Sequence, residues 1–505
     1  MNGFNDFESE PLRLTGRKDL LLVIAPPFFT AMPHIGVAYL SRYLQHHGVS
    51  AGVYDLSVKL FNQGDEAQKE FWQIECNNRY FVSEIAENIL KSYREEIDQF
   101  VEDLLYTRTK IIGFSVNVTS IFVANRIAQK IKEKDPEKLI VFGGAGTYFR
   151  HPRDLVRPPF ADVYVMGEGE APMLKIVRDF YDQKPLVSGP GIFLTKDLGK
   201  KQPEPAIEIP DVNAIPFPTF EGFDLQDYDA GNETKTLPLL LSRGCVRRCS
   251  YCIDYLIWPK YRHRSPEHIL SEIQYHLSNH RIDTFHFNDL SCNGNLGQLS
   301  GFCDLVLRSG CRFRWESYAI VRKDMPLELF QKMKQAGCHT LVFGVESASD
   351  RIMKLMNKSY TAHDASQALR LSHEAGIHTH MNIIVGFPGE TEEDFQQTLK
   401  FLEANKDHID LVANVNGFSV LPETDVDQNR EKYGVFFDSS AEPMLFKDAN
   451  GLDREGRFRR VARVMEAVER LGLRKGFVSK PALNPEVLAY KKKGPFWRKR
   501  AAPPH

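Results

Sequence analysis

The sequence predicts an α/β protein built from two successive sheets, and three observations support this class. Short apolar runs alternate with amphipathic helical segments over residues 19–181, and a second alternation of the same kind covers residues 237–420. A proline-rich stretch with weak periodicity, residues 183–236, separates the two. A chain of 505 residues also exceeds what one hydrophobic core usually serves, so we expect two or three domains.

The first alternation predicts a doubly wound, Rossmann-like domain over residues 18–182, preceded by a tail of residues 1–17. Strands that alternate with helices are typical of parallel sheets covered by helices on both faces. The strand-like runs are residues 19–25, 52–56, 110–116, 138–144 and 161–170. The helical segments are residues 34–47, 82–105 and 122–134, and one that ends near residue 181.

The second alternation predicts a partial (β/α)6 TIM-type barrel over residues 237–425, with its site at the carboxyl ends of the strands. We interpret residues 183–236 as a connector and residues 426–505 as a small, mostly helical C-terminal region with a basic tail. The six strand-like runs of the barrel are residues 237–241, 283–287, 313–319, 340–345, 378–386 and 411–420.

Composition excludes several classes of protein. With 42% hydrophobic and 26% charged residues, the chain is typical of soluble globular proteins. A formal net charge of -2 argues against a nucleic-acid binder, and the one basic cluster, residues 491–500, lies in the tail. No run of about 18 apolar residues predicts a membrane span. Eight cysteines are too few for a disulfide scaffold, so we expect a cytoplasmic protein; the sequence predicts no particular oligomeric state.

Three cysteines, Cys245, Cys249 and Cys252, follow the first strand of the barrel with the spacing C-x3-C-x2-C. Three thiolates at this spacing can hold one iron–sulfur cluster. A structural zinc site needs four ligands, and His263 is an alternative fourth ligand. The other cysteines fit buried structural positions, with a second cluster formed by Cys292, Cys303 and Cys311 as an alternative.

This motif, with the aromatic residue Tyr251 before its last cysteine, resembles the radical S-adenosylmethionine (SAM) enzymes. The resemblance extends over about residues 235–425. It implies that the three cysteines hold a four-iron four-sulfur cluster whose unligated iron binds SAM. It also implies that an electron from the cluster cleaves SAM to give a 5′-deoxyadenosyl radical.

The same resemblance implies further roles in SAM binding. Glu346, in VFGVES, matches the residue that binds the ribose hydroxyls, and carboxylates suit this role because they accept two hydrogen bonds. The remaining candidates are Asn288 and Asp289 near the methionyl amine, Gly386 and Pro388 beside the adenine, and Arg322 and Lys358 near the methionyl carboxylate. The sequence departs from the family at VLPETDV, where Glu423 stands in place of a glycine.

The N-terminal domain resembles the cobalamin-binding domain that precedes many radical SAM domains, through residues 26–56, 112–120, 141–152 and 161–170. The resemblance implies that Ser115, Asn117 and Thr119 face the corrin edge, and that Gly143, Gly144 and Gly146 form the crevice for the nucleotide-like tail. No Asp-x-His-x-x-Gly motif occurs, so we expect water or a noncoordinating residue below the cobalt. A domain that binds no cobalamin is the alternative; an NAD site is disfavoured because the G-x-G-x-x-G fingerprint is missing.

The resemblance implies cobalamin-dependent methyl transfer to an unactivated carbon of a small-molecule or natural-product intermediate. We expect the active site in the crevice between the domains, and an electron donor such as flavodoxin or ferredoxin. The alternatives are radical cyclisation or rearrangement with cobalamin, aminocarboxypropyl transfer from SAM, and a non-catalytic iron–sulfur or cobalamin sensor.

Overall fold

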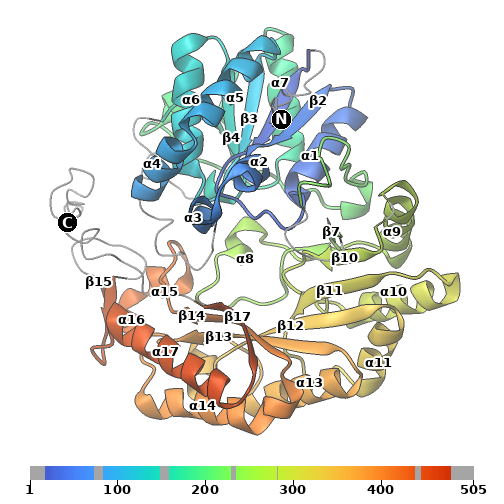
Figure 1. Cartoon of the computed structure of the whole chain (residues 1–505), viewed down its shortest axis with the longest axis vertical. Helices are drawn as coiled ribbons and strands as arrows, with labels where there is room; N and C mark the ends of the chain where they lie inside the picture. The colour runs from blue at the N-terminus through green and yellow to red at the C-terminus, as the bar shows by residue number, and fades with distance from the viewer. Residues whose placement is uncertain are drawn as a thin grey trace, which may run out of the picture. The chain divides into compact units, whose positions relative to one another are not determined.

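The computed structural model describes residues 17–72, 83–147, 159–228, 235–280, 282–437 and 445–478. They divide into two compact units (Figure 1). The N-terminal unit holds the described residues up to 209 and residues 214–235, and the C-terminal unit holds residues 210–213 and those from 236 onward. Among the described helices, none is long and apolar enough to cross a membrane.

A six-stranded sheet forms the centre of the N-terminal unit, in the order β2-β1-β3-β4-β5-β6. All pairs are parallel except β5 with β6, which comes from the predicted connector and closes one edge. The strands are β1 (Leu20–Ile24), β2 (Ala51–Asp55), β3 (Ile111–Ser115), β4 (Leu139–Gly143), β5 (Val163–Val165) and β6 (Ile192–Leu194).

Helices cover both faces of this sheet, as a doubly wound fold requires (Figure 1). Between the sheet and one helical layer, Phe114, Phe142 and Tyr164 of neighbouring strands pack edge to face at 5.6 and 6.1 Å. The helix predicted over residues 82–105 is interrupted at Tyr93. The helices are α1 (Ile35–His46), α2 (Leu56–Gln63), α3 (Glu66–Lys69), α4 (Ser83–Ser92), α5 (Arg94–Tyr106), α6 (Ile121–Lys134) and α7 (Glu170–Tyr181).

The C-terminal unit contains a parallel sheet, in the order β17-β14-β13-β12-β11-β10-β7. Six of its strands match the six predicted runs, and β17, from the region predicted to be mostly helical, adds a seventh. The strands are β7 (Thr236–Leu239), β10 (Thr284–Phe287), β11 (Arg314–Ala319), β12 (Cys338–Glu346), β13 (His378–Val385), β14 (Leu411–Gly417) and β17 (Arg474–Val478). Two short antiparallel ribbons pair β8 (Ser242–Arg243) with β9 (Arg262–His263) and β15 (Val435–Phe437) with β16 (Phe446–Asp448).

One face of this sheet is packed against helices. Phe287 of β10 stacks on Trp315 of β11 at 4.7 Å, and both rings contact Phe302 of α10. Side chains alternate between the faces of a strand, so the residues between these aromatic groups point to the opposite, inner face. The helices are α8 (Asp254–Ile257), α9 (Pro266–His280), α10 (Leu296–Ser309), α11 (Leu327–Gln335), α12 (Asp350–Leu355), α13 (Ala362–Glu374), α14 (Glu392–Asn405), α15 (Asp425–Gln428), α16 (Arg430–Tyr433) and α17 (Arg454–Arg470).

The predicted fold class, a doubly wound domain followed by a partial barrel, is confirmed. The domain boundaries stay a prediction.

Candidate active site

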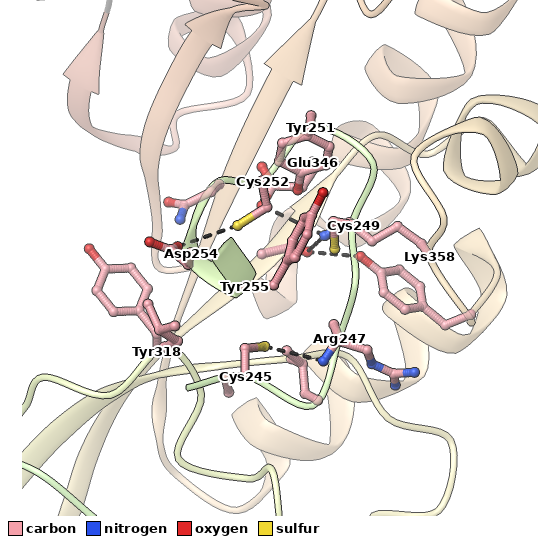
Figure 2. Close-up of a pocket in the computed structure, with 16 residues that line it drawn as sticks. Cys245, Arg247, Cys249, Tyr251, Cys252, Asp254, Tyr255, Tyr318, Glu346 and Lys358 are labelled. Atoms are coloured by element: carbon pink, nitrogen blue, oxygen red, sulfur yellow. Dashed lines mark hydrogen bonds and ion pairs between the residues drawn. The ribbon is translucent and has the colours of Figure 1, made fainter. Parts of the chain in front are cut away.

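The three cysteines line one pocket of about 150 Å³ in the C-terminal unit (Figure 2). The pocket lies where the loop after β7 and β8 meets the carboxyl ends of β11, β12 and β13. Its lining comprises Cys245, Arg247, Cys249, Tyr251, Cys252, Asp254, Tyr255, Leu290, Tyr318, Ala319, Ile320, Gly344, Glu346, Lys358, Tyr360 and Asn382.

The cysteine loop is fixed at both ends. At its start, the buried Asp289 carboxylate accepts hydrogen bonds from the Leu241 amide at 2.8 Å and from the Ser242 hydroxyl. Gly244, directly before the first cysteine, has φ of +86°, and a Cβ there would lie 2.5 Å from the Lys260 carbonyl oxygen. Further along, the Ser250 hydroxyl donates to the Leu355 carbonyl at 2.9 Å. The thiols are therefore held in place by the protein itself.

Each thiol has its own polar neighbour (Figure 2). The backbone amide of Arg247 donates to Cys245 Sγ at 3.4 Å, and Cys252 Sγ lies 3.4 Å from Asp254 Oδ2. Burial, followed by the Asp254 carboxyl, raises the pKa of Cys252. Burial also raises the pKa of Cys249, while the Lys358 ammonium acts in the opposite direction. Metal coordination would supply the charge stabilisation that the thiolate forms of these half-buried cysteines need.

Glu346 and Lys358 form a buried polar group beside the cysteines. Lys358 Nζ lies 3.9 Å from Glu346 Oε1, donates to the Gly344 carbonyl at 3.2 Å, and sits 5.6 Å from the centre of the Tyr251 ring. Burial raises the pKa of Glu346, although Lys358 and Tyr251 act to lower it. Burial disfavours the Lys358 ammonium, but Tyr360, Tyr251, Glu346 and Cys249 outweigh it and raise the pKa of Lys358. Glu346 has φ of +67°, a left-handed conformation that is uncommon for non-glycine residues and that also occurs in this chain at Arg108, Gln183, Asn357 and Glu423.

The lining fits an iron–sulfur cluster together with SAM. In the described part of the chain, no three His, Cys, Asp or Glu side chains are placed to hold a single metal ion, whereas in a four-iron cluster each thiolate binds a separate iron. The Glu346 carboxylate can accept hydrogen bonds from ribose hydroxyls, and the Lys358 ammonium can bind a carboxylate. The donor set therefore matches the groups that SAM presents.

Five of the predicted SAM-binding residues lie outside the pocket lining: Asn288, Asp289, Arg322, Gly386 and Pro388. Asn288 is exposed, and Asp289 is buried beneath the cysteine loop, where burial raises its pKa to about 6. Arg322 pairs with Asp324 and donates to the carbonyls of residues 293 and 294. Their contact with SAM stays a prediction.

The glycine turn after β13 is engaged by other parts of the protein. Gly386 has φ of +73°, its amide donates to Glu390 Oε2 at 2.7 Å, and its carbonyl accepts from Arg457 Nε at 2.9 Å. Pro388 is buried and, with Gly386, lies outside the pocket lining. Glu423, where the family has glycine, adopts a φ of +67°, so the left-handed backbone that a glycine would favour is present.

In the N-terminal unit, the predicted cobalamin-binding residues lie on the loops after β3 and β4. Asn117 Oδ1 accepts hydrogen bonds from the amides of Thr119 and Ser120 at 2.9 and 2.8 Å. The Thr119 hydroxyl lies 3.2 Å from the Pro27 carbonyl, and Ser115 Oγ lies 3.1 Å from His34 Nε2. Each of these three polar side chains thus has a hydrogen-bond partner within the N-terminal unit.

The glycines after β4 serve close packing. A Cβ at Gly144, whose φ is +101°, would lie 2.7 Å from the Val116 carbonyl oxygen, and one at Gly146 would lie 2.6 Å from the Asn117 carbonyl. At Gly143, the last residue of β4, a Cβ would lie 3.6 Å from Val165 Cβ, which is an ordinary contact distance. The two loops therefore approach one another closely, and the role of these residues toward cobalamin stays a prediction.

The alternative metal sites gain no support from the placement of their residues. Cys292 and Cys303 are buried, and burial raises the pKa of both thiols, in the case of Cys303 to about 12. Cys311 is half-buried at the end of α10, and His263 lies in β9, outside the pocket lining.

Sequence reasoning missed several residues that line the pocket. Asp254 and Tyr255 directly follow the cysteine motif, so proximity to Cys252 could have indicated them. Tyr318 and Asn382 occupy inner-face positions of β11 and β13, which the period-2 pattern of those strands could have identified once the helix-packed face was known.

Comparisons with known proteins agree with this geometry. Residues 239–402 match the model of the radical SAM superfamily. The chain is 27% identical over 316 residues to an uncharacterized methyltransferase of Pyrococcus horikoshii. It is 28% identical over 315 residues to the anaerobic magnesium-protoporphyrin IX monomethyl ester cyclase of Rubrivivax gelatinosus. Each match covers 60% of this chain, and they cover 68% and 56% of the respective relatives.

Among solved structures, the radical SAM methyltransferase TsrM of Kitasatospora setae, with tryptophan substrate and a SAM analogue bound, has a TM-score of 0.65 at 16% identity over 89% of both chains. The same enzyme with cobalamin and a [4Fe-4S] cluster bound has a TM-score of 0.62 at 17% identity, over 88% of this chain and 81% of TsrM. At these identities the likeness shows the fold alone.

Every residue that lines the cysteine pocket lies within the part of the chain that matches the radical SAM superfamily. Residues 239–402 form a domain that matches the radical SAM superfamily, and the predicted cluster and SAM are the cofactors that this domain implies.

Proposed function

We propose that the protein is a cobalamin-dependent radical SAM methyltransferase that methylates an unactivated carbon of a small molecule. The observation that carries the proposal is the shared pocket, in which Cys245, Cys249 and Cys252 lie beside the Glu346–Lys358 pair. The methyltransferase among the relatives supports methyl transfer. The doubly wound N-terminal unit supports cobalamin binding, because the fold of this chain resembles that of cobalamin-bound TsrM.

In this proposal the protein mainly holds and orients its cofactors. The three thiolates hold the cluster, Glu346 accepts the ribose hydroxyls of SAM, and Lys358 donates to its carboxylate. Tyr251 packs edge-on against Phe418, with ring centres 6.3 Å apart, and limits the access of water to this side of the pocket. When bound, the cluster and SAM supply hydrogen-atom abstraction, and cobalamin supplies the methyl group.

Product analysis under anaerobic conditions tests the proposal. The reconstituted protein would receive SAM with a deuterated methyl group, cobalamin, a reduced flavodoxin or ferredoxin, and a pool of small metabolites. We expect 5′-deoxyadenosine and S-adenosylhomocysteine to form in parallel, with one metabolite gaining a labelled methyl group.

Other outcomes would contradict methyl transfer. 5′-Deoxyadenosine without S-adenosylhomocysteine would indicate cyclisation or rearrangement, a reaction class represented by the cyclase relative. Neither product would indicate a sensor. An absorption spectrum of the anaerobically purified protein tests cobalamin separately, because corrin bands are distinct from those of the cluster.

A further inference from the structure

The inner face of the C-terminal sheet carries polar side chains to which the proposed binding of the cluster and SAM assigns no role. Phe285, Phe287 and Trp315 point to the helix-packed face and are fully buried. His286 of β10 pairs in register with Glu316 of β11, so both lie on the opposite face.

His286 and Glu316 form a cross-strand pair on this face. His286 Nδ1 lies 2.9 Å from Glu316 Oε1, and the two side chains are 15% and 35% exposed. Burial acts to raise the pKa of Glu316, but the hydrogen bond with His286 and the charges of His286, His339 and His380 outweigh it and lower the pKa. Glu316 is therefore a carboxylate, and within the described residues its hydrogen bond to His286 occupies Oε1, which leaves Oε2 for another donor.

Tyr318 connects this pair with the cysteine pocket. It lies two residues after Glu316 on the same face, lines the pocket, and keeps 38% of its surface exposed. Its ring packs edge-on against His286, with ring centres 6.1 Å apart. Burial raises the pKa of Tyr318, and the charges of Glu316 and Glu346 raise it further. Tyr318 therefore interacts electrostatically with both carboxylates. Figure 2 shows Tyr318 and Lys358 on opposite sides of the pocket.

Asn382 of β13 adds a hydrogen-bonding group to the same region. It lines the pocket, and its Oδ1 accepts from Asn414 Nδ2 at 2.8 Å, which directs its amide nitrogen away from β14. A carboxylate oxygen, an exposed aromatic ring and an amide thus adjoin the cofactor pocket. An apolar ligand would leave the carboxylate oxygen and the amide without hydrogen-bond partners, which disfavours its binding.

We infer that Glu316, Tyr318 and Asn382 form the substrate-binding surface, and that the substrate is a small molecule with a hydrogen-bond donor, an amine or a hydroxyl, next to an apolar part. The donor binds Glu316, the apolar part packs on Tyr318, and Asn382 bonds an acceptor of the substrate. This inference rests on the proposed function, because it assumes that the pocket next to this surface holds the cluster and SAM.

Three matched probes test it on the reconstituted full-length protein: 2-phenylethylamine, 2-phenylethanol and 3-phenylpropanoate. They share the ring and differ in the polar group. We expect the dissociation constant of the carboxylate probe to exceed those of the amine and the alcohol at least about tenfold, because it places like charges together. The ratio between amine and alcohol shows which donor is preferred.

Glu316→Gln should weaken binding of the preferred donor about tenfold and abolish discrimination against the carboxylate probe. Glu328→Gln, on the exposed side of α11, is the matched control and should change neither. Tyr318→Leu should weaken all three probes to a similar extent. Iron content and the melting temperature of each variant verify that it is folded.

Equal or tighter binding of 3-phenylpropanoate would overturn the inference, as would a Glu316→Gln variant that behaves like Glu328→Gln. Failure of the amine and the alcohol to bind at millimolar concentration would also overturn it. Binding needs no turnover, so discrimination by Glu316 without any 5′-deoxyadenosine would leave the surface intact and refute the proposed function instead.

Discussion

The cysteine loop and the glycine turn after β13 were both predicted to contact SAM, yet the structure uses them differently. The cysteines face a pocket, and the backbone around them is held by groups behind the loop, such as Asp289. In the glycine turn, Glu390 and Arg457 bind the amide and the carbonyl of Gly386, and a Cβ there would lie 2.5 Å from Arg457 Cγ. One predicted motif therefore faces an open pocket, whereas the other is already engaged by contacts within the protein.

The loops of the N-terminal unit resemble the glycine turn, because their residues are engaged by contacts within the protein. Asn117 binds backbone amides of its own loop, and Gly146 makes room for the backbone of Asn117. Contacts within the protein already account for these residue types, so cobalamin binding needs its own spectroscopic test.

Substitution of a cysteine should have the largest effect. In Cys249→Ala we expect loss of the cluster and a fall in 5′-deoxyadenosine formation of about 100-fold or more, because the cofactor carries out the chemistry. Cys311→Ala, at the end of α10, is the control and should keep both. Iron content and product formation are measured on the same anaerobic samples. A Cys249→Ala variant with full iron content would show that the pocket does not hold the cluster.

Substitutions beside the glycine turn should lower the free energy of unfolding. Glu390 and Arg460 form a buried ion pair of 2.5 Å, with side chains 1% and 10% exposed. Arg460→Met leaves the Glu390 carboxyl buried without its partner and should lower the free energy of unfolding by about 3 kcal/mol. Arg463→Met, which removes the partner of the half-exposed Glu392 in the first turn of α14, should cost about 0.5 kcal/mol.

Urea denaturation of the protein and both variants compares these costs. Equal costs for the two variants would show that α17 does not hold the turn through the buried pair.

The sequence predicted the strands well, because their apolar runs are buried on the helix side and are bounded by polar loops. The cysteine loop, Tyr251, Glu346 and Lys358, all predicted from the sequence, line one pocket, and their contacts with a ligand stay a prediction. The sequence could not show that Gly386 and Asp289 lie outside this pocket. Their hydrogen-bond partners, Arg457 and the cysteine loop, come from distant parts of the chain. Strand β17 was missed since its sequence, RKGFV, follows a helix and is short and polar.

Substitution of Lys358 tests whether a residue of the pocket contributes to the binding of SAM. Lys358→Met removes the cation beside Glu346 and should raise the dissociation constant of SAM about tenfold, which corresponds to about 1.4 kcal/mol. Lys354→Met, at an exposed position of α12, is the control. Equilibrium binding of SAM to the cluster-loaded protein gives the constants. Unchanged SAM affinity in Lys358→Met would place the methionyl carboxylate elsewhere.

The exposed pair beside the glycine turn should show the smallest effect, and one that depends on pH. The hydrogen bond from Arg463 lowers the pKa of Glu392 to about 2, against partial burial, and the Glu392 side chain is 50% exposed. A carboxyl whose pKa is lower in the folded state stabilises the fold above its unfolded pKa, and this contribution is lost as the pH falls from about 4.5 toward 2.

Because solvent screens an exposed pair, Glu392→Gln should lower the free energy of unfolding by about 0.5 kcal/mol at pH 7. The difference from the unsubstituted protein should shrink as the pH falls below 4.5 and should also shrink at high salt, since the pair is accessible to ions. Urea denaturation at neutral and acidic pH, with and without added salt, measures both trends. A loss of several kcal/mol that is insensitive to salt would mean that this pair, like Glu390 with Arg460, is shielded from water and holds α14 to α17 as strongly as the buried one.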